Sequence, residues 1–148
     1  MTTHQNGTKI FGSHIDRTMK IIRQHYMQAF RDLGVDITTE QWVIVDSLFH
    51  QDGQSQTELA DGSFKNMATV SRIIDLTCQK GFTERFRSES DKRRYRVFLT
   101  KKGKEVYHKI KPTVDQLRQK GWKGLSDEDY DDFLRIMNTI FSNFKEAE

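Results

Sequence analysis

Two short segments in which apolar and polar residues alternate flank a cationic stretch, and this arrangement constrains the fold more than any other feature. The segments are residues 81–87 and 95–99, and Lys92, Arg93 and Arg94 lie between them. Alternation with a period of two is typical of a β-strand with one buried face. The pattern therefore predicts a β-hairpin with a positively charged tip. Such a tip needs either solvent or a polyanion opposite it.

The length and the cysteine count limit the class of protein. A chain of 148 residues suits one domain of ordinary size, or two small units that share a core. Its single cysteine, Cys78, cannot form an intrachain disulfide, so we expect a reducing, cytoplasmic location. No apolar run reaches the roughly 18 residues that span a bilayer, so we expect no membrane partner.

The charges are distributed unevenly along the chain. Residues 80–109 hold eleven Lys or Arg against four Asp or Glu, a net charge of +7. Residues 126–148 hold two against seven, a net charge of −5. One region therefore attracts polyanions although the whole chain carries only +3.

Apolar residues recur at helical spacing near both ends of the chain. They predict a long first helix over residues 11–33 and a last helix that begins at Ser126. The apolar stripe of the last helix consists of Phe133, Ile136 or Met137, Ile140, Phe141 and Phe144. A single small domain cannot bury both stripes. We therefore expect them to pack against a second copy of the chain.

Helix-capping signals divide the middle of the chain into three shorter helices. Thr38 and Gln41 have the spacing of a capping box, Ser55 caps a short helix over residues 56–61 that Gly62 ends, and Asn66 caps a helix that runs to residue 80. The expected buried residues are Trp42, Val45, Leu48 and Phe49 in the first of these helices, Leu59 and Ala60 in the second, and Val70, Ile73 or Ile74, and Thr77 in the third.

The two helices before the hairpin have the order of a helix-turn-helix unit, whose second helix presents its N-terminal side chains to base edges in the major groove. The candidate DNA-binding residues here are Lys65, Asn66, Met67, Ala68, Thr69, Ser71 and Arg72, with Ser55, Gln56 and Arg87 as neighbours. Hydroxyls can reach bases or phosphates, Met and Ala can contact thymine methyls, and Arg can bind guanine or phosphate in a bidentate way. The alternative is an amphipathic surface helix without a reading role.

Five motifs together resemble the MarR family of bacterial transcription regulators. They are residues 58–60 (ELA), 69–75 (TVSRIID), 80–82 (KGF), 91–93 (DKR) and 99–103 (LTKKG), and the resemblance covers residues 11–144. It implies a mainly α fold with a small β-wing (α+β): a winged helix-turn-helix domain over residues 35–100 and a helical dimerisation region formed by residues 1–34 and 101–148. It also implies a transcription regulator, a repressor by expectation, that binds a palindromic double-stranded DNA operator as a homodimer.

The tip of the predicted wing has a physical rationale of its own. A carboxylate at Asp91 can hold one edge of the Arg93 guanidinium and so orient it. An oriented arginine suits a narrow minor groove, and by resemblance Arg93 is the minor-groove residue, with Lys92, Arg94 and Arg96 at phosphates. The rival interpretation is a winged-helix protein-interaction module that meets an acidic partner and lacks sequence-specific DNA binding.

Within this family a small aromatic effector is the expected regulator, bound between the dimerisation helices and the winged domain. Tyr26, Phe30, Trp42 and Tyr107 are the candidate pocket walls, although aromatic residues at helical spacing also pack in cores. Cys78 lies at a helix C-terminus, whose dipole disfavours a thiolate. We identify no catalytic group, no metal site and no cofactor motif, since the five histidines are scattered.

Overall fold

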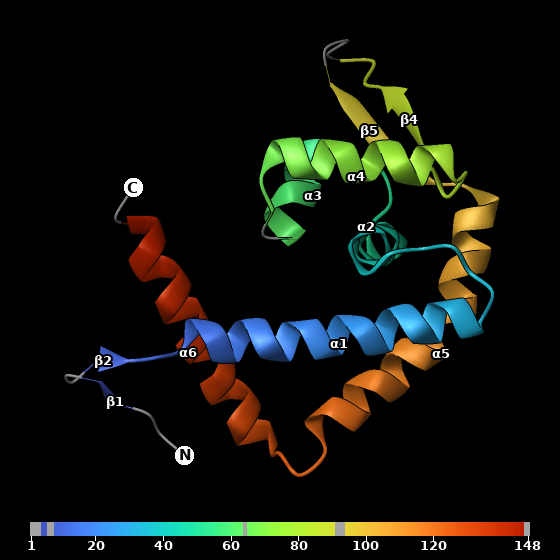
Figure 1. Cartoon of the computed structure of the whole chain (residues 1–148). Coiled ribbons are helices and arrows are strands. Elements are labelled where there is room, and N and C mark those ends of the chain that lie inside the picture. The colour runs from blue at the N-terminus through green and yellow to red at the C-terminus, as the bar shows by residue number, and fades with distance from the viewer. Residues whose placement is uncertain (1–3, 6–7, 64, 91–93, 147–148) are drawn as a thin grey trace. The chain divides into compact units, whose positions relative to one another are not determined.

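The computed structural model describes residues 4–5, 8–63, 65–90 and 94–146. The helices are α1 (Gly12–Asp32), α2 (Thr39–His50), α3 (Gln56–Ser63), α4 (Met67–Gln79), α5 (Lys101–Trp122) and α6 (Asp127–Glu146) (Figure 1). The strands are β1 (His4–Gln5), β2 (Thr8–Lys9), β3 (Gln54–Ser55), β4 (Thr83–Arg87) and β5 (Tyr95–Leu99). The mainly helical fold with a small antiparallel sheet confirms the predicted class.

The chain divides into two compact units, residues 1–114 and residues 115–148. The first unit contains the predicted winged domain together with α1 and the beginning of α5. The predicted grouping, with residues 1–34 and 101–148 as a dimerisation region and residues 35–100 as the winged domain, concerns the role of each segment in an assembly. It stays a prediction.

The first unit has a core to which most of its elements contribute. α2 packs against α3 and α4, and α4 also packs against β4. The largest fully buried side chains are Phe30, Ile37, Ile44, Leu48, Leu59, Ile73, Ile74 and Ile110, with Val45, Val70, Val97 and Val114 among them. This core fixes the position of α4 relative to the hairpin.

α2 begins with the expected capping box. The Thr38 hydroxyl accepts a hydrogen bond from the Gln41 backbone N–H at 3.1 Å, and the Gln41 amide oxygen accepts one from the Thr38 N–H at 3.1 Å. The expected burial of Phe49 is wrong, because its side chain is 39% exposed. One face of its ring stacks on Tyr107, with the centroids 3.7 Å apart, and the position at the end of α2 leaves the rest open.

α3 is longer than the sequence pattern indicates. Ser55 caps it as expected, since its hydroxyl accepts from the Glu58 N–H at 3.1 Å. The helix continues to Ser63, so the prediction that Gly62 ends it is wrong. A glycine costs a helix only about 1 kcal/mol relative to alanine. The burial of Leu59 and Ala60 against the core favours the helix at this position.

The predicted hairpin is present, and β3 adds a third strand to it. The strand order is β3-β5-β4, with Thr83 opposite Leu99 and Arg87 opposite Tyr95. β3 consists of two residues, too few for a sequence pattern. The residue before it, Gly53, has φ +72°, and a Cβ there would lie 2.9 Å from the Phe98 ring. A larger residue would therefore meet both backbone strain and a steric clash.

The first turn of α5 is joined to the start of β4 by backbone contacts. The Thr100 N–H donates to the Phe82 carbonyl at 3.0 Å, and the Thr100 hydroxyl accepts from the Gly103 N–H at 3.0 Å, which caps the helix. A Cβ on Gly103 would lie 2.1 Å from the Phe82 oxygen. Only glycine allows the helix backbone to come this close to the strand.

The second unit consists of the end of α5 and the whole of α6. The Ser126 hydroxyl accepts from the Asp129 N–H at 3.1 Å, and the Asp129 carboxylate accepts from the Ser126 N–H at 2.8 Å, so α6 starts with a capping box at the expected serine. The Trp122 ring packs edge-on against Tyr130 and Phe133. Among the other apolar residues of α6, Leu134, Ile136, Phe141 and Phe144 are exposed, and Met137 and Ile140 are half-buried.

Candidate nucleic-acid interface

α4 is held so that one face is buried and its N-terminal end is accessible. The Asn66 side chain accepts from the Thr69 N–H at 2.8 Å, which confirms the predicted cap. The inward face consists of Val70, Ile73, Ile74 and Thr77. Among the predicted reading residues, Asn66, Met67, Ala68 and Arg72 are exposed and Lys65, Thr69 and Ser71 are half-buried.

Thr77 is a buried polar residue on this inward face. Its hydroxyl lies 2.7 Å from the Ile74 carbonyl and 2.7 Å from the Thr83 hydroxyl, so its hydrogen-bonding capacity is used. Thr83 also lies 3.2 Å from the Cys78 sulfur. A buried hydroxyl is tolerated when it has such partners. The threonine pair therefore joins the end of α4 to the start of the wing.

A charged contact joins the same two elements nearer the middle of α4. The Arg85 guanidinium on β4 donates to the Asp75 carboxylate at 2.5 Å and to the Ser71 carbonyl at 3.4 Å. The Arg85 side chain is 25% exposed, so this contact is partly screened from solvent. α4 and the wing are thus held together by two separate polar contacts.

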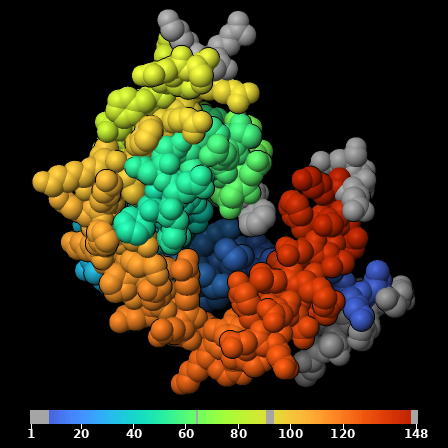
Figure 2. Space-filling view, turned by 180° about the vertical axis from the view of Figure 1, so that it is seen from behind, coloured from blue at the N-terminus to red at the C-terminus, as the bar shows by residue number. Residues whose placement is uncertain are grey.

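The strands of the wing carry cations on both faces. On the face towards α4, the Arg87 Nε donates to the Tyr95 hydroxyl at 3.2 Å, and its guanidinium lies over the Tyr95 ring. On the opposite face, Arg96 donates to the Gly53 carbonyl at 2.9 Å. Figure 2 shows the yellow wing strands at one end of the first unit, beside the green and teal surface of α2 and α3.

The predicted wing tip, Asp91, Lys92 and Arg93, lies outside the described residues. The interpretation of these three residues stays a prediction. What the structure places is the base of the wing, from which the chain enters and leaves the tip.

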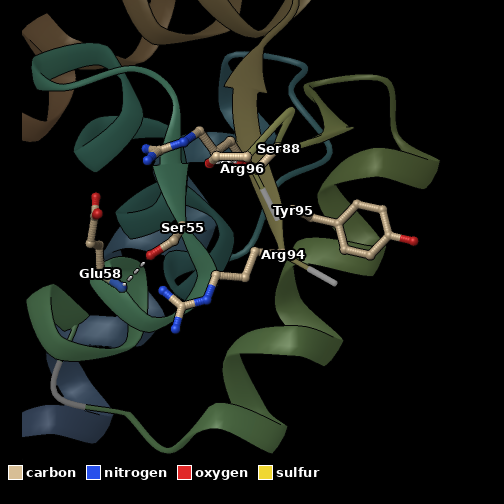
Figure 3. Close-up of a pocket in the computed structure, with 7 residues that line it drawn as sticks. Ser55, Glu58, Ser88, Arg94, Tyr95 and Arg96 are labelled. Atoms are coloured by element: carbon tan, nitrogen blue, oxygen red, sulfur yellow. Dashed lines mark hydrogen bonds between the residues drawn. The ribbon is translucent and has the colours of Figure 1, made fainter. Parts of the chain in front are cut away.

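A small polar cavity lies at this base, with a volume of about 160 Å³. It is lined by Ser55, Glu58, Ser88, Ser90, Arg94, Tyr95 and Arg96. In Figure 3, Arg94 and Arg96 lie on the same side of β5 as Ser55, while the Tyr95 ring points the other way. Two guanidinium groups and several hydroxyls give the cavity the chemistry of a phosphate contact.

The structure therefore brings together residues that were predicted from separate motifs. Ser55 from the start of α3 and Arg94 and Arg96 from the wing share one cavity. Gln56 does not line it, since its amide donates to the Met67 carbonyl at 3.3 Å and ties α3 to α4. The sequence pattern missed Ser88 and Ser90, for which the only signal is their position at the end of a strand facing the start of α3.

The four candidate walls of an effector pocket occupy different surroundings. Phe30, Trp42 and Tyr107 are buried in the core, and Tyr26 is half-buried with its ring edge-on to Phe30 at 6.1 Å. The Trp42 and Tyr107 rings stack with their centroids 5.4 Å apart, and Phe49 covers the other side of Tyr107. The rings thus fill the space between them with one another. Their role as pocket walls stays a prediction.

A larger open hollow of about 620 Å³ lies elsewhere on the first unit. Its lining comes from the α1–α2 loop, the end of α4, Phe82 and the first turns of α5. Two of its lysines are engaged: Lys80 donates to Gln41 at 2.8 Å, and Lys102 donates to the Lys80 carbonyl at 2.9 Å. Lys109 also lines the hollow. Sequence reasoning did not identify this hollow.

The described residues hold no group of three or more His, Cys, Asp or Glu placed to bind a metal ion. Cys78 is a half-buried free thiol. Within the same described part of the chain, no helix is both long and apolar enough to cross a membrane.

Comparisons with known proteins agree with this geometry. Over 127 residues the chain is 28% identical to the HTH-type transcriptional repressor YetL of Bacillus subtilis. This match covers 86% of this chain and 74% of YetL. The fold matches MepR of S. aureus in a complex with DNA, with a TM-score of 0.77, 23% identity, and coverage of 91% of this chain and 99% of MepR.

A second structural match is PcaV of Streptomyces coelicolor in complex with its natural ligand, with a TM-score of 0.75, 17% identity, and coverage of 96% and 98% of the two chains. Residues 37–95, which include α2, α3, α4, β4 and the start of β5, match the model of the MarR family. The relatives are transcriptional regulators and not enzymes. Residues 37–95 therefore form a MarR-family domain, and the chain has the winged-helix fold of MarR transcriptional regulators.

Proposed function

We propose that the protein is a DNA-binding transcription regulator, a repressor that binds a palindromic operator as a homodimer and is released by a small aromatic ligand. Two observations carry the proposal: α1 and α6 each expose apolar residues, and the reading helix α4 has one buried and one accessible face. The exposed apolar residues indicate that the chain binds a partner chain. The accessible face of α4 indicates that it enters a DNA groove.

The homodimer is inferred from the exposed apolar residues. On α6 the Phe133, Ile136, Phe141 and Phe144 side chains are 47%, 47%, 53% and 66% exposed, and Ile21 and Ile22 on α1 are also exposed. Contiguous apolar patches of this kind are typical of interfaces. A second copy of the same chain supplies a self-complementary partner, as symmetric dimers do.

The mode of DNA binding is inferred from the orientation of α4. Met67 and Ala68 are exposed at its N-terminal end, where a reading helix contacts base edges. The Arg94 and Arg96 cavity is suited to a backbone phosphate, and Arg93 to the minor groove. In a twofold dimer the two α4 helices would then enter successive major grooves about 10 base pairs apart.

The proposals that the protein represses transcription and that a ligand releases it from DNA are supported only by its relatives. YetL is named a repressor, and PcaV is seen with a natural ligand. A ligand can release DNA only if it binds more tightly to a form of the dimer with the wrong separation of its reading heads. The aromatic residues Tyr26, Phe30, Trp42 and Tyr107 are the candidate walls of its site.

The experiment is selection of bound fragments from random duplex DNA, combined with sedimentation of the protein and of its complex. We expect a palindrome with half-sites about 10 base pairs apart, bound by two chains. We also expect affinity to fall steeply with salt, since each neutralised phosphate releases counterions. Recovery of sequences without symmetry, or a monomer on DNA, would contradict the proposal.

A further inference from the structure

One carboxylate on α2 contacts two cations of the reading head. The Glu40 Oε1 lies 3.7 Å from the Lys65 Nζ, and the Glu40 Oε2 lies 3.7 Å from the Arg72 Nη2. Lys65 precedes α4 and Arg72 lies in its second turn, so the single carboxylate contacts cations at the start and in the second turn of the helix. Both cations are candidate DNA contacts.

The distances and exposures make these contacts exchangeable. A separation of 3.7 Å is longer than a hydrogen bond, so attraction between charges is the main interaction. The Arg72 and Glu40 side chains are 61% and 43% exposed, and ion pairs so open to water are weak. A DNA phosphate can therefore replace Glu40 as the partner of either cation.

The helix fixes the backbone position of Glu40. The residue lies in the first turn of α2, directly between the capping-box residues Thr38 and Gln41, where the positive end of the helix dipole favours a carboxylate. When Lys65 or Arg72 turns to DNA, its attraction to this carboxylate is lost. Every duplex must overcome this opposition, whatever its sequence.

We propose that Glu40 lowers the affinity of the reading head for duplex DNA by competing with phosphates for Lys65 and Arg72. The inference rests on the proposed operator binding. On a nonspecific duplex, phosphate attraction alone competes with Glu40. On the operator, the base contacts of α4 also favour the bound state. Because the opposition is the same on both duplexes, Glu40 lowers both affinities by a similar factor and so keeps nonspecific binding weak.

The experiment compares the E40Q variant with the D36N variant as a matched control. D36N removes the same charge and breaks a comparable exposed pair, Asp36 with Lys80 at 3.3 Å, but Lys80 is not a candidate DNA contact. The affinities of wild type and both variants are measured over a range of salt concentrations, on a nonspecific duplex and on the selected operator. Circular dichroism melting checks that both variants are folded.

E40Q should bind nonspecific duplex about three- to tenfold more tightly at about 0.1 M salt. Its salt slope should be steeper by about 1 to 2, because two cations that were paired now release counterions. D36N should change the affinity less than about twofold, since an exposed charge with no DNA contact acts weakly. The operator affinity should rise by a similar factor, so that the ratio of operator to nonspecific affinity changes less than about twofold in E40Q.

A double-mutant background completes the test. In a chain that carries K65A and R72A, the additional E40Q change should affect affinity no more than D36N does, because its partners are gone. E40Q binding no tighter than D36N, or an undiminished effect in this background, would overturn the inference about Glu40 while leaving operator binding intact. A wild-type chain that binds no duplex would overturn both proposals.

Discussion

The contact between Arg85 and Asp75 gives a prediction whose size follows from the structure. It joins β4 to α4 through a donor–acceptor distance of 2.5 Å, with 25% of the Arg85 side chain and 54% of the Asp75 side chain exposed. A charged hydrogen bond contributes about 1.5–3 kcal/mol when well buried, and an exposed ion pair about 0.2–1 kcal/mol. Because one partner is half-open to solvent, we expect a coupling of about 1 kcal/mol between the two side chains.

The assay is a double-mutant cycle of D75N and R85Q, followed by urea unfolding at one fixed protein concentration, since dimerisation would link stability to concentration. A coupling of about 1 kcal/mol corresponds to about 2–4 °C in Tm for a chain of this size. It should shrink in about 1 M salt, where the screening length is about 3 Å. The exposed Lys20–Asp16 pair of α1 serves as the control cycle, with an expected coupling of about 0.3 kcal/mol.

Two outcomes would refute this reasoning. Additive effects of D75N and R85Q would mean that the contact contributes nothing beyond each side chain alone. A coupling equal to that of Lys20 and Asp16 would mean that partial burial at the wing has no energetic consequence.

The remaining predictions concern the α5 junction and the wing tip. G103A should lower the free energy of unfolding by about 3 kcal/mol, because its Cβ would lie 2.1 Å from the Phe82 oxygen; G121A, where nothing lies within 4 Å, is the control, and equal urea midpoints would contradict the expectation. R93A should weaken operator binding by about 1–3 kcal/mol in fluorescence anisotropy, as the loss of a specific arginine contact does. Loss of the dimer in sedimentation of R93A would conflict with a role confined to DNA.

The parts of the fold that could be predicted are those whose signals are local. The caps formed by Thr38 with Gln41, by Asn66 and by Ser126 each use residues within three positions, and all three are present. The burial of Phe49 could not be predicted because it depends on where α5 places Tyr107. The prediction that Gly62 ends α3 failed because the cost of one glycine in a helix is small compared with the free energy gained by burying the neighbouring side chains.

The candidate site also has a part that could be predicted from the sequence and a part that could not. The residue types of α4 and the wing could be recognised from sequence, but their pairings could not. Glu40 meets Arg72, and Asp75 meets Arg85, only after α2, α4 and β4 have packed. No spacing along the chain indicates that these cations already have acidic partners.

The close approach of Gly103 to the Phe82 carbonyl sets a rule for building chimaeras. A designer who wishes to transplant this reading head would place the seam between β5 and α5, where residues 35–100 end. Such a graft would omit Gly103. Any other residue at the equivalent position of the host helix would place its Cβ against the Phe82 carbonyl oxygen. The transplantable piece therefore extends into α5, and its seam belongs at least one turn beyond Gly103.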